Sequence, residues 1–218
     1  MCFSAKASFT LGALLISTGI FSTITAKNSN KNYIYLALIP IFFGIQQVIE
    51  GIIWLQMYGD KFTGSSFWVY FYLFFAFYFW PAFIPLCSYR IEQNTTRKKV
   101  LAGFLLAGII LGAIIYVPIL LGVISTKAMV MGQCIQYDVH QSITLSSLYT
   151  IFYLFIITMS LLISSIPKIK LLGIVILISA NISYWWYFHA FTSTWCFFAA
   201  AISIYIAYIV YRLPIKPN

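Results

Sequence analysis

The chain has 218 residues, of which 62% are hydrophobic and only 8% are charged. Soluble domains carry about 25% charged residues, so lipid rather than water must surround most of this surface. The net charge of +9 does not indicate nucleic-acid binding, because the basic residues lie in short loops between apolar runs and form no basic face. The composition predicts a single transmembrane domain over residues 1–218, without a cleavable signal peptide.

Seven apolar runs are each long enough to cross a bilayer as a helix, which takes about 20 residues. Backbone polar groups in lipid must be bonded within their own segment or in a closed barrel, so runs of this length favour helices. We therefore predict an all-α integral membrane protein with seven transmembrane helices and a long outer loop over residues 125–141. The predicted spans are residues 8–26, 33–57, 67–89, 100–124, 142–163, 171–189 and 192–211.

The distribution of basic residues predicts the orientation, because Lys and Arg stay preferentially on the cytoplasmic side. With seven spans, ten of the 13 basic residues share a side with the C-terminus. The N-terminus should therefore lie outside and the C-terminus in the cytoplasm, and an even number of spans would break this sorting. The ten are Lys27, Lys31, Arg90, Arg97, Lys98, Lys99, Lys168, Lys170, Arg212 and Lys216, against Lys6, Lys61 and Lys127.

Glycines and prolines bear on how the predicted helices pack. Gly103, Gly108 and Gly112 in the fourth run are expected to let neighbouring helices approach closely. Four prolines fall within or near the ends of spans, where each removes a backbone donor and favours a kink. They are Pro40, Pro81, Pro85 and Pro118.

The second predicted span carries polar groups at helical spacing through apolar surroundings. These are Gln46, Gln47 and Glu50, and Glu50 is the only carboxylate that we place at membrane depth. A charge there costs roughly 2.5–3.5 kcal/mol or more unless it is paired, hydrated or protonated. The functional interpretation is a polar pocket in the outer half of the bundle for an ion or a small amphipathic ligand. The structural alternative is an interhelical hydrogen bond made by a protonated acid.

Aromatic and amide side chains extend this set of ligand-binding candidates. Asn181, with Tyr184 one turn further along the sixth span, is the expected polar partner of Glu50. Aromatic walls suit an apolar ligand with a few polar anchors. Trp and Tyr are also enriched at membrane interfaces, so packing and interfacial belts explain the same residues.

The histidines and cysteines leave several interpretations open. His140 and His189 with Glu50 have ligand types that zinc accepts, but no local ligand motif supports a metal site. Cys2 and Cys134 both fall on the outer, oxidising side, where they can pair as a disulfide. Two free thiols fit the sequence equally well. We find no cofactor motif and no Lys in the middle of the last span for a retinal Schiff base.

Several short motifs occur along the chain in a fixed order. They are MCFSA at the N-terminus, GIQQVIEG at residues 44–51 with Trp54 shortly after, Trp80-Pro81, and WCFFAA at residues 195–200. Together they resemble an uncharacterised prokaryotic family of multi-pass membrane proteins with no established activity. The resemblance implies an integral protein of a bacterial or archaeal cytoplasmic membrane. It also suggests that the motif residues, Trp54 among them, belong to one shared design.

Three functions are compatible with these observations. The first is binding or transport of an ion or small amphipathic ligand by the pocket built on Gln46, Gln47 and Glu50. The second is a metal- or thiol-dependent membrane enzyme acting on a lipid or quinone-like substrate. The third is a sensory or scaffold subunit without a ligand. The expected partner is the lipid bilayer, and the sequence leaves open whether copies form a homo-oligomer.

Overall fold

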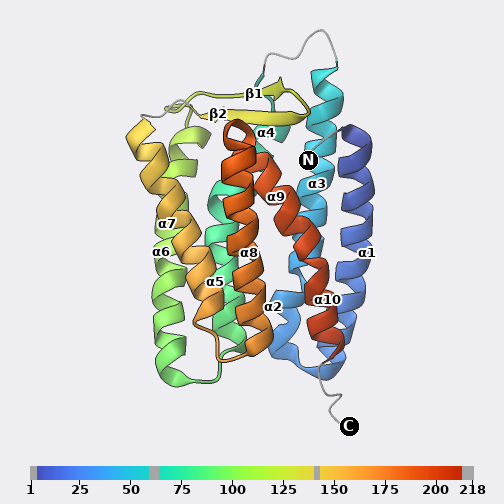
Figure 1. Cartoon of the computed structure of the whole chain (residues 1–218), viewed down its shortest axis with the longest axis vertical. Coiled ribbons are helices and arrows are strands. Elements are labelled where there is room, and N and C mark those ends of the chain that lie inside the picture. Colours follow the sequence, from blue (N-terminus) through green and yellow to red (C-terminus); the bar gives the residue numbers. More distant parts are fainter. Residues whose placement is uncertain (1–3, 59–63, 140–142, 213–218) are drawn as a thin grey trace.

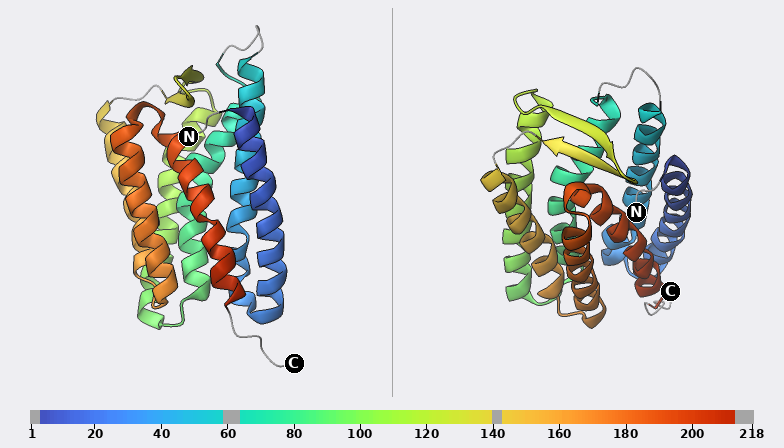
Figure 2. Two further views of the ribbon diagram at one scale, coloured as in Figure 1. Left: turned by 45° about the vertical axis from the view of Figure 1, so that its right-hand side comes forward. Right: turned by 45° about the horizontal axis from the view of Figure 1, so that its top comes forward.

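The computed structural model describes residues 4–58, 64–139 and 143–212, which form seven helical rods and one β-hairpin (Figure 1). The rods run roughly parallel to the long axis, and the hairpin lies across one end of the bundle, here called the hairpin end (Figure 2). The mostly helical architecture predicted from the sequence is confirmed.

Four rods are single helices, and three are built from successive shorter segments. The first four rods are α1 (Ala5–Ser29); η1 (Lys31–Tyr33), α2 (Ile34–Ala37) and α3 (Ile39–Met57); α4 (Phe67–Leu73), the π-helical η2 (Phe74–Phe79) and α5 (Trp80–Ile91); and α6 (Thr95–Leu120). The hairpin consists of β1 (Thr126–Met131) and β2 (Cys134–Val139). The last three rods are α7 (Ile143–Leu162); α8 (Pro167–Trp186); and η3 (Phe188–Ala190), α9 (Phe191–Ile202) and α10 (Ile204–Tyr211).

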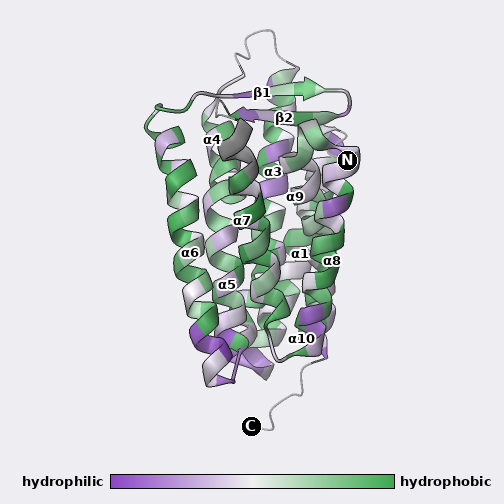
Figure 3. Cartoon of the chain, turned by 60° about the vertical axis from the view of Figure 1, so that its left-hand side comes forward, coloured by the Kyte–Doolittle hydropathy of each residue, from purple (hydrophilic) through white to green (hydrophobic). Residues whose placement is uncertain are grey.

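The surface of the rods is apolar. Six of them are long and apolar enough to cross a membrane, and a shorter apolar stretch, Leu148–Leu162, lies in α7. Apolar residues continue along most of the bundle (Figure 3). Large apolar side chains such as Leu120 and Ile151 are 62% and 61% exposed. An apolar surface of this extent is typical of contact with a membrane rather than with water. These features suit a multi-pass membrane protein in contact with lipid.

The outer loop predicted for residues 125–141 is instead an antiparallel hairpin over residues 126–139, so the fold is not purely helical. Lys127 stands opposite Asp138, and Gly132 makes the turn with a φ of +61°, a conformation that glycine adopts without steric cost. Tyr137 of β2 stacks on Tyr72 of α4, with ring centroids 4.5 Å apart. The hairpin is therefore anchored to the bundle end that it covers.

The third rod is irregular at its centre. Pro81 has no N–H, so the carbonyl of Phe77, four residues earlier, loses its α-helical donor. The Tyr149 hydroxyl of α7 donates to this carbonyl at 2.9 Å. The π-helical segment η2 ends at the residue before Trp80, and such turns are rare in helices and frequent at functional sites. Trp80 therefore directly follows the irregular turn.

Two of the three glycines predicted to allow close packing do so. A Cβ atom on Gly108 of α6 would overlap the carbonyl group of Pro81, and one on Gly112 would lie 2.9 Å from the Cα atom of Tyr78. Only glycine lets α6 lie this close to the third rod. A Cβ atom on Gly103 would meet no heavy atom within 4 Å, so the packing role predicted for Gly103 is wrong.

Candidate functional site

The polar residues of α3 lie together inside the bundle. Gln46, Gln47 and Glu50 each have 0% of their surface exposed. Trp54, one turn beyond Glu50, is 3% exposed, and its ring lies against that of Tyr58. Helical spacing brings these side chains to one interior region of the bundle. Because they are buried, losing any of their hydrogen bonds would lower the stability of the fold.

Hydrogen bonds join this part of α3 to two other rods. The Ser193 hydroxyl of α9 donates to Oε1 of Glu50 at 2.6 Å, and the Gln47 amide donates to Oε2 of Glu50 at 3.4 Å. The indole N–H of Trp80 donates to Oε1 of Gln46 at 2.7 Å. The two residues that one of these hydrogen bonds joins are up to 143 positions apart in the sequence. We call Gln46, Gln47, Glu50, Trp80 and Ser193 the polar cluster.

The cluster continues to a thiol. The Gln46 amide donates to the Cys196 sulfur at 3.4 Å. Gln46 therefore uses its carbonyl oxygen for α5 and its amino group for α9. Removing this side chain would leave a buried indole N–H without its acceptor, a loss of about 1–3 kcal/mol. Gln46 fixes the relative positions of Trp80 and Cys196.

Two predicted ligand-binding residues do not join the cluster. Asn181 is exposed and donates to the carbonyl of Leu177 in its own helix. Tyr184 is 47% exposed and contacts aromatic rings near the end of α8. The predicted partnership of Asn181 with Glu50 is therefore wrong, because the face of α8 that carries Asn181 points out of the bundle.

The predicted metal and disulfide sites fall partly outside the described residues. Cys2, His140 and the side chain of His189 are not described. Among the residues that are, no group of three His, Cys, Asp or Glu side chains could hold a metal ion. Cys134, the first residue of β2, is buried and forms no disulfide with another described cysteine. The zinc set of His140, His189 and Glu50 and the disulfide of Cys2 with Cys134 stay predictions.

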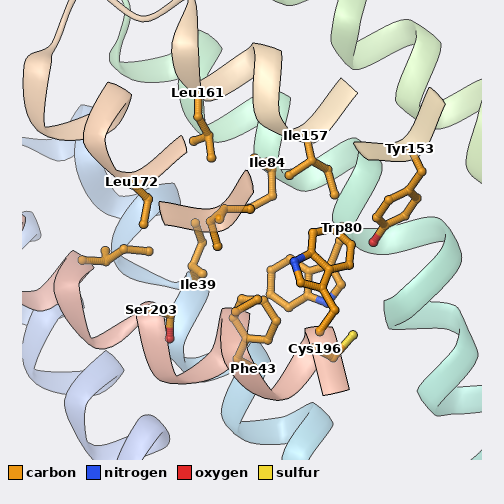
Figure 4. Close-up of a pocket in the computed structure, with 14 residues that line it drawn as sticks. Ile39, Phe43, Trp80, Ile84, Tyr153, Ile157, Leu161, Leu172, Cys196 and Ser203 are labelled. Carbon is orange, nitrogen blue, oxygen red and sulfur yellow. The ribbon is translucent and has the colours of Figure 1, made fainter. Parts of the chain in front are cut away.

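An apolar cavity begins beside the polar cluster (Figure 4). Trp80, Cys196 and Tyr153 lie at one end of it, and Leu172 and Ser203 lie toward the other. The space between its lining atoms is about 500 Å³, including the part open to the surroundings. Because it extends away from the hairpin, we call it the inner cavity.

A second cavity lies nearer the hairpin and is called the outer cavity. It has about 330 Å³ between its lining atoms, which include Tyr149 and Thr150 of α7 and Thr192 of α9. Tyr153, Trp195 and Cys196 line both cavities. Neither lining includes the three polar residues of α3. The acid and amides of α3 are therefore enclosed behind the cavity wall, and Trp80 is the member of the polar cluster that lies in the wall itself.

Three residues at this site were not singled out from the sequence. Ser193 carried no signal beyond a polar position at the start of an apolar run. Tyr153 was one aromatic among many in the fifth span. Trp195 did carry a signal, since it opens the WCFFAA motif, but the sequence does not reveal that it faces two cavities.

Residues 1–217 match a group of proteins described as "Family of unknown function (DUF6629)". The chain belongs to this family. The expected membership of an uncharacterised family over the whole chain is thereby confirmed, although DUF6629 membership assigns no chemistry. No curated protein and no solved structure matches the chain. The chemistry of this DUF6629 protein must therefore be argued from its own geometry.

Proposed function

We propose that this DUF6629 protein crosses the cytoplasmic membrane of a prokaryote seven times, with its N-terminus outside. At the end opposite the hairpin lie the loop after α1, the α5–α6 loop, the α7–α8 loop and the end of α10 (Figure 1). The basic residues concentrate there, in agreement with the preference of Lys and Arg for the cytoplasm. Nine lie in the described residues: Lys27, Lys31, Arg90, Arg97, Lys98, Lys99, Lys168, Lys170 and Arg212.

Aromatic rings accompany several of these cations. The Arg90 guanidinium lies 4.7 Å from the ring centre of Tyr35, and both Lys168 and Arg212 lie 5.5 Å from that of Tyr208. Such pairs are typical of membrane interfaces.

Cysteines introduced one at a time into a Cys2→Ser background test the proposed orientation. An impermeant maleimide should label K127C on intact cells and K98C only after permeabilisation, and the reverse pattern would overturn the orientation.

We further propose that the bundle binds or transports a small amphipathic molecule. One observation carries this proposal: the inner cavity is apolar along its length but ends on Trp80 and Cys196, both hydrogen-bonded to Gln46. An apolar tail fits the cavity, and a polar end would lie next to the polar cluster. An ion alone fits less well, because carboxylates and amides are absent from the described lining of either cavity.

The source of the ligand decides which contacts matter. A ligand that enters from lipid gains little from burying its tail, because lipid chains are as apolar as the cavity wall. Recognition must therefore come from shape and from the polar end. The polar cluster keeps that end of the cavity in place through Gln46, which holds α5 and α9, and through Glu50, which holds the first turn of α9.

A photoreactive dodecanol with a diazirine in its chain tests this function on the purified protein. Labelling of the cavity residues should be saturable and suppressed by excess dodecanol. Ala199 lines the inner cavity, and Ala199→Phe should fill it and abolish the saturable part. Ala107 is exposed on α6, so Ala107→Phe is the matched control and should label normally. Equal saturable labelling of both variants would contradict the proposal.

A further inference from the structure

The indole of Trp195 stands at the junction of the two cavities. It is 5% exposed and lines both of them. Its ring is stacked on Phe191, with centroids 5.6 Å apart, and meets the edge of Tyr153 at 5.5 Å. Rings on two sides hold the indole in one orientation, so its N–H cannot easily turn toward another acceptor.

This N–H has no hydrogen-bond partner among the described residues. An indole nitrogen can only donate, and a buried donor without an acceptor is costly. Trp80, on the wall of the same inner cavity, provides the contrast because its N–H donates to Gln46 at 2.7 Å. Buried polar groups of native proteins are almost always satisfied, and an exception calls for a missing partner.

Other unmatched groups nearby do not compete for that partner. The indole N–H of Trp54 also lacks an acceptor in the described structure, but Trp54 lines neither cavity. The Tyr149 hydroxyl faces the outer cavity and already donates to the carbonyl of Phe77. Its oxygen can still accept. Among the described residues that line the two cavities, Trp195 is therefore the one whose fully buried polar atom has no hydrogen-bond partner.

The charge of the site limits the ligand further. The described lining of both cavities contains no Lys, Arg, Asp or Glu side chain. A charged group seated there would lose its hydration without gaining a counter-ion, which is expensive at membrane depth. The outer cavity has some polar lining, from residues such as Thr150 and Thr192, whereas the inner cavity is apolar. An uncharged head group on the outer side fits this division.

We infer that the ligand is a neutral amphiphile whose head group carries a carbonyl-type oxygen, and that Trp195 donates its indole N–H to that oxygen. The head group lies at the junction with the outer cavity, and the alkyl tail occupies the inner cavity. This inference rests on the proposed ligand-binding function and adds the chemical class of the ligand. It makes Trp195 the residue that distinguishes a carbonyl compound from a plain hydrocarbon.

Competition against the photoreactive dodecanol tests the inference. The probes are 2-tridecanone and tridecane, with concentrations expressed as mole fractions in detergent so that partitioning is equal. In the wild type the ketone should compete about five- to tenfold better than the alkane, as one hydrogen bond in a dry site allows. Trp195→Phe should reduce that ratio to about twofold or less, with tridecane competition unchanged as evidence of folding. Trp185, 77% exposed, gives the control Trp185→Phe, which should keep the wild-type ratio.

The possible outcomes distinguish a failure of this inference from a failure of the proposed ligand-binding function. Equal competition by ketone and alkane in the wild type, a comparison that needs no variant, would overturn the inference while saturable labelling still supports ligand binding. An unchanged ratio in Trp195→Phe would overturn it as well. Stronger competition by dodecylammonium or dodecanoate would refute the neutral head group. A lack of saturable labelling in the wild type would remove both the function and the inference.

Discussion

Glu50 is the centre of the hydrogen bonds that hold α9 against α3. Its two carboxyl oxygens accept from Ser193 and Gln47, and all three side chains are fully buried. The Ser193 hydroxyl and the Gln47 amide are neutral donors, so these two hydrogen bonds require an acceptor at this position rather than a charge. The structure therefore gives Glu50 a positioning role toward the cavity wall.

Two substitutions at Glu50 distinguish its role as a hydrogen-bond acceptor from the effect of its charge. Glu50→Gln keeps a carbonyl oxygen for the Ser193 hydroxyl, and its new amino group can donate to Oε1 of Gln47 once the Gln47 amide turns over. This variant should therefore cost little stability. Glu50→Leu leaves two buried donors without an acceptor and should cost about 1–3 kcal/mol for each of them. Unfolding in mixed detergent micelles measures both variants. Equal stability of the two would contradict the positioning role.

Glu92 performs a similar task at the opposite end of the molecule. It follows α5, is 2% exposed, and accepts hydrogen bonds from the backbone N–H groups of Gln93, Asn94 and Ser165 and from the Ser165 hydroxyl. Burial raises the pKa of Glu92, but these hydrogen bonds outweigh burial and lower the pKa below its ordinary value of 4.5. The carboxylate thus ties the α5–α6 loop to the α7–α8 loop.

The lowered pKa of Glu92 predicts a pH dependence. A carboxyl group with a lower pKa in the folded state stabilises the fold above about pH 4.5 and loses this contribution as the pH falls through the folded-state pKa. At pH 7, Glu92→Gln should be less stable than wild type by about 1.5–3 kcal/mol, since hydrogen bonds to a charged group weaken. Melting curves at pH 7 and below pH 4 check this. A difference that stays the same at both pH values would contradict it.

At the scale of elements, the close contact between α6 and the third rod depends on glycines, which have no side chain. A Cβ atom on Gly108 would lie 2.6 Å from the carbonyl carbon of Pro81. Pro85 has no N–H, so the Pro81 carbonyl also lacks its α-helical donor. Backbone cannot move aside as a flexible side chain does, so any methyl group added at Gly108 must push the helices apart.

Matched glycine substitutions test this contact. Gly108→Ala should destabilise the protein by about 1–3 kcal/mol through overpacking. Gly103→Ala, on the same helix but with open space around it, should be neutral or slightly stabilising because alanine favours a helix. Both are measured by unfolding under identical conditions. If Gly108→Ala were as stable as Gly103→Ala, α6 would not lie as close to Pro81 as described.

The helices and the hairpin show which features of a membrane protein can be predicted from its sequence. Run lengths located the helical rods to within a few residues, and the spacing of Gln46, Gln47 and Glu50 predicted a shared interior face, because polar groups avoid hydrocarbon. Asn181 was misplaced because α8 is apolar all round, so periodicity does not tell its lipid-facing side from its core side. The hairpin was missed because its two short strands alternate only weakly and their pairing depends on the turn at Gly132.

The site itself was predictable only in part for a related reason. The acid and amides of α3 are visible as a pattern, but their partners Ser193, Trp80 and Cys196 come from two other rods. Contacts between segments so far apart in sequence have no local signature. The cavities depend on how side chains from several rods fill the space between them, which no periodicity encodes.

For the whole molecule, the described parts combine into one arrangement. The hairpin covers one end through Tyr137 and Tyr72, and β2 contacts α9. Helix α9 carries Ser193 toward Glu50 and Trp195 and Cys196 toward the cavities. A displacement of the hairpin would therefore act on the helix that forms the cavity wall. Helix α9 therefore connects the hairpin end to the proposed ligand site.

The most direct test of a bound amphiphile is native mass spectrometry of the protein extracted from its own membrane in mild detergent. We expect one small neutral amphiphile to be retained per chain in the wild type and in Ala107→Phe, and to be lost in Ala199→Phe, whose added ring fills the inner cavity. A wild-type spectrum with no retained molecule, or one that Ala199→Phe leaves unchanged, would contradict the account.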